Sequence, residues 1–444
     1  MPSPHPSRRR VLAGSLSALA TTGVLAPTAS CAPPASASGR TRLRFWHLFG
    51  GGDGVNMQKM LDAFRAAHPD VELEATTLQW GAPYYTKLGM AGAGGRAPEV
   101  AALHMARLAG FGPGRLVDPF DPDLLAEAGI RPADFPEDLW RRGRIDGRQY
   151  AVPLDTHPLV LYYQTDICRK AGLMDGTRLK PIQGAAEFTE ALRAVRKVTG
   201  TAALVTETLG PDCITPWRLF STFYSQTGGT VLTPDGKGQA LDDAKALRVL
   251  EFMAGLVGEG LWTRRADYAA AVGIFNQGRT AFHLNGDWEV TTFRTGGTPF
   301  SMTRVPALFG RATAQADSHA FVLPHQRGRD TVTDRAACVF VAWMLKNSVE
   351  WAAGGHVPAY RPVLSDPAYL ALDPQSAYRD VIDDVVLDEP AWFAGSASRM
   401  WIELGEVFST LLTGSRTPRE ALSEAKLRLG RLLDTRNPLP GVVS

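Results

Sequence analysis

The sequence predicts an α/β protein built from two lobes. Strand-like and helix-like segments alternate along the chain, its length suits two or three domains, and proline-bearing segments mark places where it could cross between lobes. Removal of residues 1–30 leaves 414 of the 444 residues. The composition, with 45% hydrophobic and 21% charged residues, is typical of a globular protein with a large core.

The first part of the chain alternates strands with helices. Residues 43–48 and 71–76 are expected to form strands, and a glycine-rich turn at 50–54 follows the first of them. A short helix over 84–90 and a strand over 99–105 come next. The apolar positions of the helix after the glycine turn are Met57, Met60, Leu61 and Phe64. This β-α-β-α-β order predicts a parallel, doubly wound half-domain.

Helical spacing returns in the rest of the chain. The expected helices cover residues 188–198, 241–256, 339–345, 401–412 and 418–433. The last one is amphipathic, and its apolar stripe consists of Leu422, Ala425, Leu429 and Leu432.

Three crossings between the lobes are expected, near residues 152–158, 303–323 and 357–362. The first and third contain prolines, which limit the freedom of the backbone. These crossings divide the chain into an N-terminal lobe of 42–154 plus about 308–356, and a C-terminal lobe of 155–307 plus about 357–444.

The N-terminus predicts export. Three arginines, Arg8–Arg10, precede an apolar run over residues 11–25, which is the pattern of a signal peptide. About 15 apolar residues reach roughly 22 Å as a helix, which is too short to span a membrane. The paired arginines resemble a twin-arginine export signal, so residues 1–30 are expected to be removed.

The end of this signal resembles a lipobox. Thr28-Ala29-Ser30 precedes Cys31, which would be lipidated and anchor the protein to the membrane. Ordinary cleavage near residues 35–37 is the alternative. Residues 31–41 are then expected to form a flexible tether.

Charge and cysteine content narrow the function. The chain carries 47 basic and 45 acidic residues, and three of the basic residues lie in the signal, so the charge from Cys31 onward is 44 minus 45, or −1. This balance lacks the basic footprint of a nucleic-acid binder. Cys168 and Cys213 could form a disulfide, or they and Cys338 could remain buried free thiols.

No sequence motif indicates an enzyme, a metal site or a cofactor. The glycine run at 50–54 does not match a phosphate-binding loop, so its preferred interpretation is a turn whose backbone N–H groups face a ligand. The histidines are scattered, with no His-Glu-x-x-His and no close His/Cys pair, so no zinc site is expected. Nothing in the spacing of the acidic residues selects the carboxylate pair of a glycosidase.

Aromatic residues beside polar ones form the strongest signal. A sugar ring presents an apolar C–H face that suits a flat aromatic ring and a hydroxyl rim that suits polar side chains. Core packing is the alternative for each ring. The candidates are Trp46, Trp80, Tyr84, Trp217, Trp288 and Tyr360.

Longer stretches carry a family resemblance. Gly147–Pro153, the following Leu161-Tyr162-Tyr163 and the segment Phe275–Trp288 resemble the extracellular solute-binding proteins of bacterial ABC importers. The match is closest to the carbohydrate-binding, maltose-binding-protein-like branch (family 1 type), and the segment Trp80–Leu88 is similar to one in sugar binders. Gln164 departs from this pattern, as asparagine is usual there.

The resemblance implies a type II periplasmic-binding-protein fold with a ligand cleft between lobes joined by a multi-crossing hinge. It implies a monomer at the outer face of the cell membrane, or in the periplasm, without catalytic activity. The protein would deliver a di- or oligosaccharide to the transmembrane subunits of an ABC permease. The alternatives are a phosphorylated polyol or anionic saccharide as ligand and, less favoured, an exported polysaccharide-active enzyme.

The resemblance also implies which residues contact the sugar. Stacking is expected from Trp46, Trp80, Trp217, Trp288 and Tyr360, and Tyr84 is a further candidate. Hydrogen bonds are expected from His47, Arg107, Asp155, His157, Asp287, His319 and Arg361. Arg107 follows the third strand, where the carboxyl ends of a parallel sheet face a ligand, and Asp155 and His157 lie near the first crossing.

Overall fold

The computed structural model describes residues 39–437. The expected signal peptide, Cys31 and the first part of the tether therefore lie outside the described residues. Within the described part, no helix is both long and apolar enough to cross a membrane.

The first sheet contains the strands nearest the N-terminus and one that returns much later in the chain. Its order is β2-β1-β3-β15-β4, and β7 also pairs with β15. β1 is parallel to β2 and β3, whereas β15 is antiparallel to β3. The strands are β1 (Thr41–His47), β2 (Val71–Thr77), β3 (Val100–His104), β4 (Val117–Asp118), β7 (Ala151–Pro153) and β15 (His319–Pro324).

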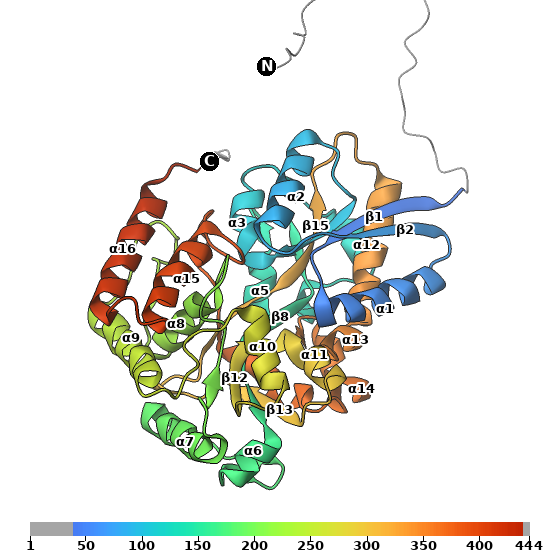
Figure 1. Cartoon of the computed structure of the whole chain (residues 1–444). Coiled ribbons are helices and arrows are strands. Elements are labelled where there is room, and N and C mark those ends of the chain that lie inside the picture. Colours follow the sequence, from blue (N-terminus) through green and yellow to red (C-terminus); the bar gives the residue numbers. More distant parts are fainter. Residues whose placement is uncertain (1–38, 438–444) are drawn as a thin grey trace, which may run out of the picture. The chain divides into compact units, whose positions relative to one another are not determined.

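Helices α1 (Gly51–Ala67) and α12 (Thr331–Lys346) pack against this sheet and against each other (Figure 1). The predicted stripe of α1 is buried, and the ring of Phe64 lies 5.1 Å from that of Phe340 on α12. The expected glycine turn is wrong, because α1 already begins at Gly51. Gly52 instead allows close packing, since a Cβ there would lie 3.0 Å from the Cβ of Thr291.

The second sheet is organised around β8 (Asp155–Gln164), in which every residue is buried. Its order is β11-β12-β8-β14-β17, and β13 and β16 also pair with β8. The other strands are β11 (Leu204–Val205), β12 (Phe282–Gly286), β13 (Phe300–Arg304), β14 (Ala314–Asp317), β16 (Val357–Pro358) and β17 (Val385–Val386).

Most of the remaining helices surround the second sheet, and α15 and α16 lie beside α8 and α9 (Figure 1). The longer ones are α2 (Ala82–Gly94), α7 (Gly184–Thr199), α8 (Thr215–Gln226), α9 (Asp243–Gly258), α10 (Tyr268–Asn276), α15 (Arg399–Leu412) and α16 (Pro418–Asp434). The shorter ones are α3 (Leu108–Phe111), α4 (Pro122–Glu127), α5 (Glu137–Arg142), α6 (Thr165–Lys170), α11 (Val290–Thr295), α13 (Val349–Ala352) and α14 (Pro367–Leu370).

Short 3-10 turns and two small hairpins complete the described elements. The 3-10 turns are η1 (Met105–Arg107), η2 (Pro132–Asp134), η3 (Asp287–Glu289), η4 (Arg361–Ser365) and η5 (Gln375–Asp384). The hairpin strands are β5 (Arg144–Ile145) with β6 (Arg148–Gln149), and β9 (Met174–Asp175) with β10 (Arg178–Leu179).

The chain passes from one sheet to the other between β7 and β8, between β14 and β15, and between α13 and β16, and segments after β16 again contact both cores. The second crossing comes later than residue 308, because β14 pairs with β8 through Ala316 and Pro158. The expected boundary after the third crossing also differs, since residues such as Tyr360 and Tyr369 pack in the core of the first sheet.

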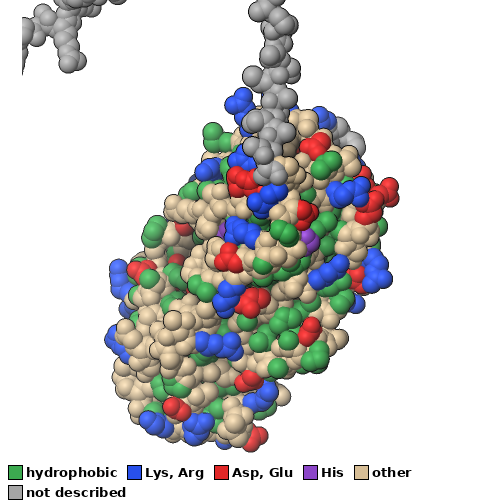
Figure 2. All heavy atoms as spheres, turned by 90° about the vertical axis from the view of Figure 1, so that its right-hand side faces the viewer, with side chains coloured by type: hydrophobic (Ala, Val, Ile, Leu, Met, Phe, Trp, Pro, Cys, Tyr) green, Lys and Arg blue, Asp and Glu red, His purple; other side chains and the backbone are tan. Residues whose placement is uncertain are grey.

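The surface charges are mixed, and the cysteines of residues 39–437 form no disulfide. On the face drawn in Figure 2, acidic and basic side chains are interspersed. Cys168, Cys213 and Cys338 are buried and free. Of the two sequence alternatives for the cysteines, the structure has free thiols.

Candidate functional site

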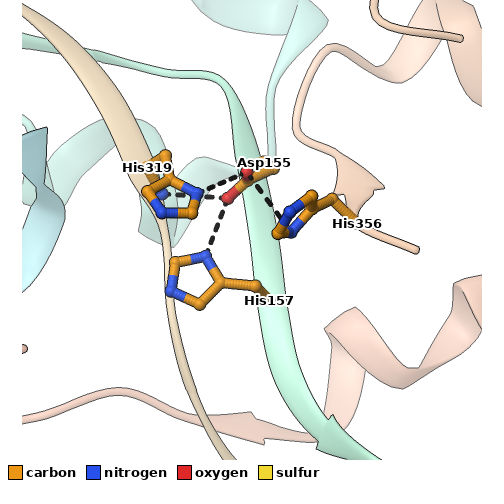
Figure 3. Close-up of side chains that lie close together, drawn as sticks. All are labelled: Asp155, His157, His319 and His356. Atoms are coloured by element: carbon orange, nitrogen blue, oxygen red, sulfur yellow. Dashed lines mark hydrogen bonds and ion pairs between the residues drawn. The ribbon is translucent and has the colours of Figure 1, made fainter. Parts of the chain in front are cut away.

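Side chains from all three crossings meet in one buried polar cluster, the crossing cluster, which consists of Asp155, His157, His319 and His356 (Figure 3). Asp155 and His157 begin β8, His319 begins β15, and His356 lies directly before β16. Each of the four residues is at most 5% exposed. Their candidate metal-ligating atoms all lie within 4.8 Å of one another.

The Asp155 carboxylate is the centre of the crossing cluster. His157 Nδ1 lies 3.0 Å from Oδ1, and His319 Nδ1 lies 2.7 Å from Oδ2. The backbone N–H of His319 donates to Oδ1 and Trp351 Nε1–H donates to Oδ2. Burial alone would raise the pKa of Asp155, but the surrounding histidines hold this pKa well below its ordinary value. The carboxylate is therefore ionised and saturated with donors.

His356 connects the crossing cluster to α1. Its Nε2 lies 3.0 Å from Oδ1 of Asp53, and its ring stacks on Trp351 with centroids 4.4 Å apart and planes 4° apart. Its Nδ1 has no hydrogen-bond partner among residues 39–437, although Oδ1 of Asp287 is 3.5 Å away. Burial acts to lower the pKa of His356, but Asp53, Asp155 and Asp287 raise it to about 10.

Two further carboxylates lie buried at strand ends of the second sheet. Asp287 follows β12, and neither of its oxygens has a hydrogen-bond partner within the described chain. Asp317 ends β14; its Oδ1 accepts from two backbone N–H groups, while Oδ2 is buried and, among the described residues, unpartnered. Burial raises the pKa of both carboxyls, that of Asp287 strongly. These are costly groups to leave without partners, by about 1–3 kcal/mol each.

Trp288 lies beside Asp287 and is only partly buried. The guanidinium of Arg218 is 5.0 Å from the Trp288 ring centroid, and the ring of His157 is 6.0 Å from it. Trp288 Nε1–H donates to the hydroxyl of Tyr268 at 2.6 Å. One aromatic ring is thus held in a fixed orientation beside buried polar groups, which is an arrangement suited to stacking a ligand.

Arg107 brings the first sheet to the same region. It follows β3 on η1, and its guanidinium lies 4.6 Å from the ring centroid of Tyr85. The Tyr85 hydroxyl is 2.5 Å from Nδ1 of His104, whose ring is 4.5 Å from that of His319. Arg107 Nε is buried and has no hydrogen-bond partner in the described part of the chain.

Three of the expected stacking residues instead lie in the cores. Tyr84 is fully buried, and its hydroxyl donates to the carbonyl of Ala102 at 2.6 Å. Trp217 is 1% exposed and packs against Phe408 in the second core. Tyr360 packs against Phe135 in the first core. For these rings, the alternative of core packing is correct, since neither face of a buried ring is open to a ligand.

The other expected residues differ in exposure. Trp46 is partly buried with Lys87 5.2 Å from its ring, while Trp80 and Arg361 are exposed. His47 is buried between the rings of Phe45 and Phe49. The role of these four in binding stays a prediction.

Sequence reasoning missed several residues of this region: Asp53, Tyr85, His104, Arg218, Asp317, Trp351 and His356. The absence of a zinc site was expected because no histidines lie close together in the sequence. Distance in the sequence does not exclude a site here, because in the structure three histidines at strand ends converge on one carboxylate from separate crossings (Figure 3). Their positions at the expected crossings were the signal that could have found them.

Comparisons with known proteins agree on one family. A family model described as bacterial extracellular solute-binding protein matches residues 59–371. The sn-glycerol-3-phosphate-binding periplasmic protein UgpB of Escherichia coli O1:K1 is 23% identical over 436 residues, covering 90% of this chain and 94% of its own.

Solved structures show the same fold. The GacH receptor of Streptomyces glaucescens, solved unliganded and with acarbose, aligns with a TM-score of 0.76 at 19% identity, covering 89% of this chain and 99% of its own. UgpB of Mycobacterium tuberculosis, solved with glycerophosphocholine, aligns at 0.73 with 18% identity and covers 89% and 99%. These neighbours confirm the predicted two-lobed periplasmic-binding-protein fold.

Proposed function

The chain belongs to the bacterial extracellular solute-binding proteins, and from that premise we propose that it captures a carbohydrate between its two lobes and delivers it to an ABC importer. The family membership confirms the resemblance predicted from the sequence. The proposed ligand is a di- or oligosaccharide. The proposed recipient is the pair of transmembrane permease subunits of the importer.

The observation that carries this proposal is a set of buried polar atoms, at or just after strand ends, that have no hydrogen-bond partner among the described residues, together with the partly buried ring of Trp288. Arg107 Nε comes from the first sheet, and both carboxylate oxygens of Asp287 and Oδ2 of Asp317 come from the second, all without a hydrogen-bond partner among the described residues. Sugar hydroxyls both donate and accept, so one ligand could satisfy a guanidinium and two carboxyl groups. Trp288 would stack on the apolar face of a sugar ring.

The balance of charge favours a neutral ligand over a phosphate. The two buried arginines already face acidic groups: Asp317 acts on both Arg107 and Arg218, and Asp287 also acts on Arg218. Burial lowers the pKa of Arg218 to about 10, so its guanidinium stays charged near neutral pH. The nearby Asp317 and Asp287 already act on this charge, so it does not require an anionic ligand. A phosphate dianion would add negative charge beside these carboxylates, which is unfavourable in a buried site.

The alternative is a phosphorylated polyol or an anionic saccharide. Arg107 supports it, because its buried Nε offers one charge-assisted hydrogen bond to a phosphate oxygen. The UgpB relatives are named for sn-glycerol 3-phosphate or were solved with glycerophosphocholine, while GacH was solved with acarbose. Both ligand classes therefore belong in the test.

Ligand would favour the closed arrangement because only then do both sheets contact it. In the structure, Asn56 of α1 donates to Thr291 of α11 at 3.1 Å, so the two lobes already touch beside the crossing cluster. We expect this contact to break when the cleft opens.

A thermal-shift screen tests the proposal. The purified chain is heated with malto- and galacto-oligosaccharides, sn-glycerol 3-phosphate and glycerophosphocholine, and a ligand of the native state raises Tm. At a ligand concentration of about 100 Kd, the stabilisation is about 2.7 kcal/mol. Trp288→Ala should abolish the shift, whereas Trp343→Phe, on the outer helix α12, should keep it. A shift with phosphates alone would replace the carbohydrate proposal with the alternative.

The remaining parts of the proposal concern location and activity. We propose a monomer without enzymatic activity or a nucleic-acid partner, exported by a twin-arginine signal and anchored by lipid on Cys31. Labelling of cells with a fatty-acid analogue tests the anchor: the chain should incorporate it and Cys31→Ser should not. Hydrolysis of an oligosaccharide that binds would instead support the polysaccharide-active enzyme.

A further inference from the structure

We propose that Asp155, His157, His319 and His356 bind a divalent transition-metal ion of the Zn²⁺ class where the three crossings meet. This site does not depend on the identity of the transported solute. Three imidazoles and one carboxylate form a donor set that suits tetrahedral Zn²⁺.

The spacing of the donors fits such an ion. Metal–ligand bonds of about 2.0–2.2 Å place neighbouring tetrahedral ligands roughly 3.3 Å apart. The Nδ1 atoms of His157, His319 and His356 lie 3.0, 2.7 and 3.7 Å from an oxygen of Asp155. These distances lie on both sides of the tetrahedral edge. Figure 3 shows the three rings turned toward the same carboxylate, His157 toward Oδ1 and His319 and His356 toward Oδ2.

His356 supplies the observation that separates a metal site from a purely structural hydrogen-bond network. Its Nδ1 is fully buried, points at Asp155 and Asp287, and has no hydrogen-bond partner in the described chain. Its distances of 3.7 Å to Asp155 Oδ2 and 3.5 Å to Asp287 Oδ1 are longer than a good hydrogen bond, so this nitrogen is held by ion pairs alone. A metal ion is an electrophile that this nitrogen could face.

The surrounding contacts hold the ligands in a binding orientation. Nε2 of His356 lies 3.0 Å from Oδ1 of Asp53. Such carboxylate–histidine pairs commonly orient a metal ligand. Trp351 Nε1–H and the backbone N–H of His319 donate to the Asp155 carboxylate and fix its plane. The outer contacts therefore position two of the four ligands, and on Asp155 they leave to an ion the lone pairs that now face Nδ1 of His157 and of His319.

The surrounding charges also favour a cation. Asp53 lies 3.0 Å from Nε2 of His356, and oxygens of Asp287 and Asp155 lie 3.5 and 3.7 Å from its Nδ1. Negative charge at this distance attracts a divalent cation.

Binding of the ion would restrict the movement of the three crossings relative to one another. Asp155 and His157 belong to the first crossing, His319 to the second and His356 to the third, so one ion would join all three. We expect the ion to stiffen the hinge and raise Tm.

The test is metal binding by the purified full chain after treatment with a chelator. Calorimetry with ZnCl₂ should show one ion bound per chain, and Tm should rise. Co²⁺ should give the intense visible d–d bands of tetrahedral coordination. No binding to the metal-free chain, or Co²⁺ bands of six-coordinate geometry only, would overturn the proposal.

Variants locate the ion. His157→Gln and His356→Gln should each weaken Zn²⁺ binding by 100-fold or more, whereas His325→Gln, a half-exposed histidine paired with Asp118, should not. Asp53→Asn removes only the orienting partner, and a loss of about 10–100-fold is expected. If a ligand variant fails to fold, Asp53→Asn and the Co²⁺ spectrum of the unmodified chain still decide. Unchanged binding in both ligand variants would place the ion elsewhere and refute the site.

Discussion

Trp351 Nε1–H donates to Oδ2 of Asp155 at 2.6 Å, and both side chains are fully buried. The bond joins α13, which packs with the first sheet, to the first residue of β8, the central strand of the second. Since Asp155 also accepts from His319 at the second crossing, one carboxylate connects the crossings to each other.

Asp155→Asn should therefore destabilise the fold strongly. The amide replaces one acceptor oxygen with a donor that faces other donors, and breaking a buried ionic network costs about 3–5 kcal/mol. Urea unfolding with a chelator present measures the loss. Asp62→Asn, in an exposed pair with Arg65, should change stability by less than about 0.5 kcal/mol. Equal effects of the two variants would contradict the central role of Asp155.

A second prediction concerns Gly355 in the same region. Its φ of +126° and a Cβ position 1.7 Å from the carbonyl oxygen of Asp287 leave no room for a side chain. Gly355→Ala should lower the free energy of unfolding by about 3 kcal/mol or more, since backbone must move.

Gly273→Ala is the matched control for Gly355→Ala. Gly273 lies inside α10, and a Cβ there meets no atom within 4 Å. The alanine should stabilise the helix by about 0.5–1 kcal/mol. If both alanine substitutions lowered the stability in thermal unfolding, the close approach at Gly355 would not be the cause of the lost stability.

Much of the fold could be predicted because periodicity is local. The apolar stripes of α1 and of the helix after Thr417 are set by residues close together in the sequence, and both stripes are buried as expected. The glycine turn was wrong because tertiary packing on Thr291 decides how far α1 extends, and composition cannot show that contact.

The site was harder to predict because its parts come from distant crossings. Asp155 and His319 are 164 residues apart in the sequence, so no spacing rule relates them. Aromatic residues beside polar ones gave mixed results: Trp288 lies in the polar region, whereas Trp217 is a core residue. A single sequence does not distinguish these two environments, because both rings flank a strand or helix end.

The free thiols give a third prediction. Burial raises the pKa of Cys168 and of Cys338 to about 12 and also raises the pKa of Cys213, so few thiolates form near neutral pH. A small alkylating reagent should label none of the three in the native chain and all three in denaturant without a reductant. Peptide mass spectrometry assigns each site. A Cys168–Cys213 peptide joined by a disulfide would contradict the structure.

The raised pKa of the Asp388 carboxyl leads to a prediction of how stability depends on pH. Burial raises its pKa to about 7, with the charge of Asp317 acting in the same direction, while hydrogen bonds from Trp401 Nε1–H and the Gly395 N–H oppose the shift. Because the folded pKa lies above the unfolded value, the folded state binds the proton more tightly. This contribution to stability is fully present below the unfolded pKa and is lost as pH rises through about 7.

Asp388→Asn isolates this effect. Asparagine cannot ionise, and its Oδ1 can still accept from Trp401 and Gly395. From about pH 5 to about pH 8, the variant should gain about 3 kcal/mol of stability relative to the unmodified chain. Asp166→Asn removes the same charge from an exposed pair with Arg169 and should show no such trend. Urea unfolding at a series of pH values measures both, and parallel curves for Asp388→Asn and the unmodified chain would show that the Asp388 carboxyl does not titrate in this range.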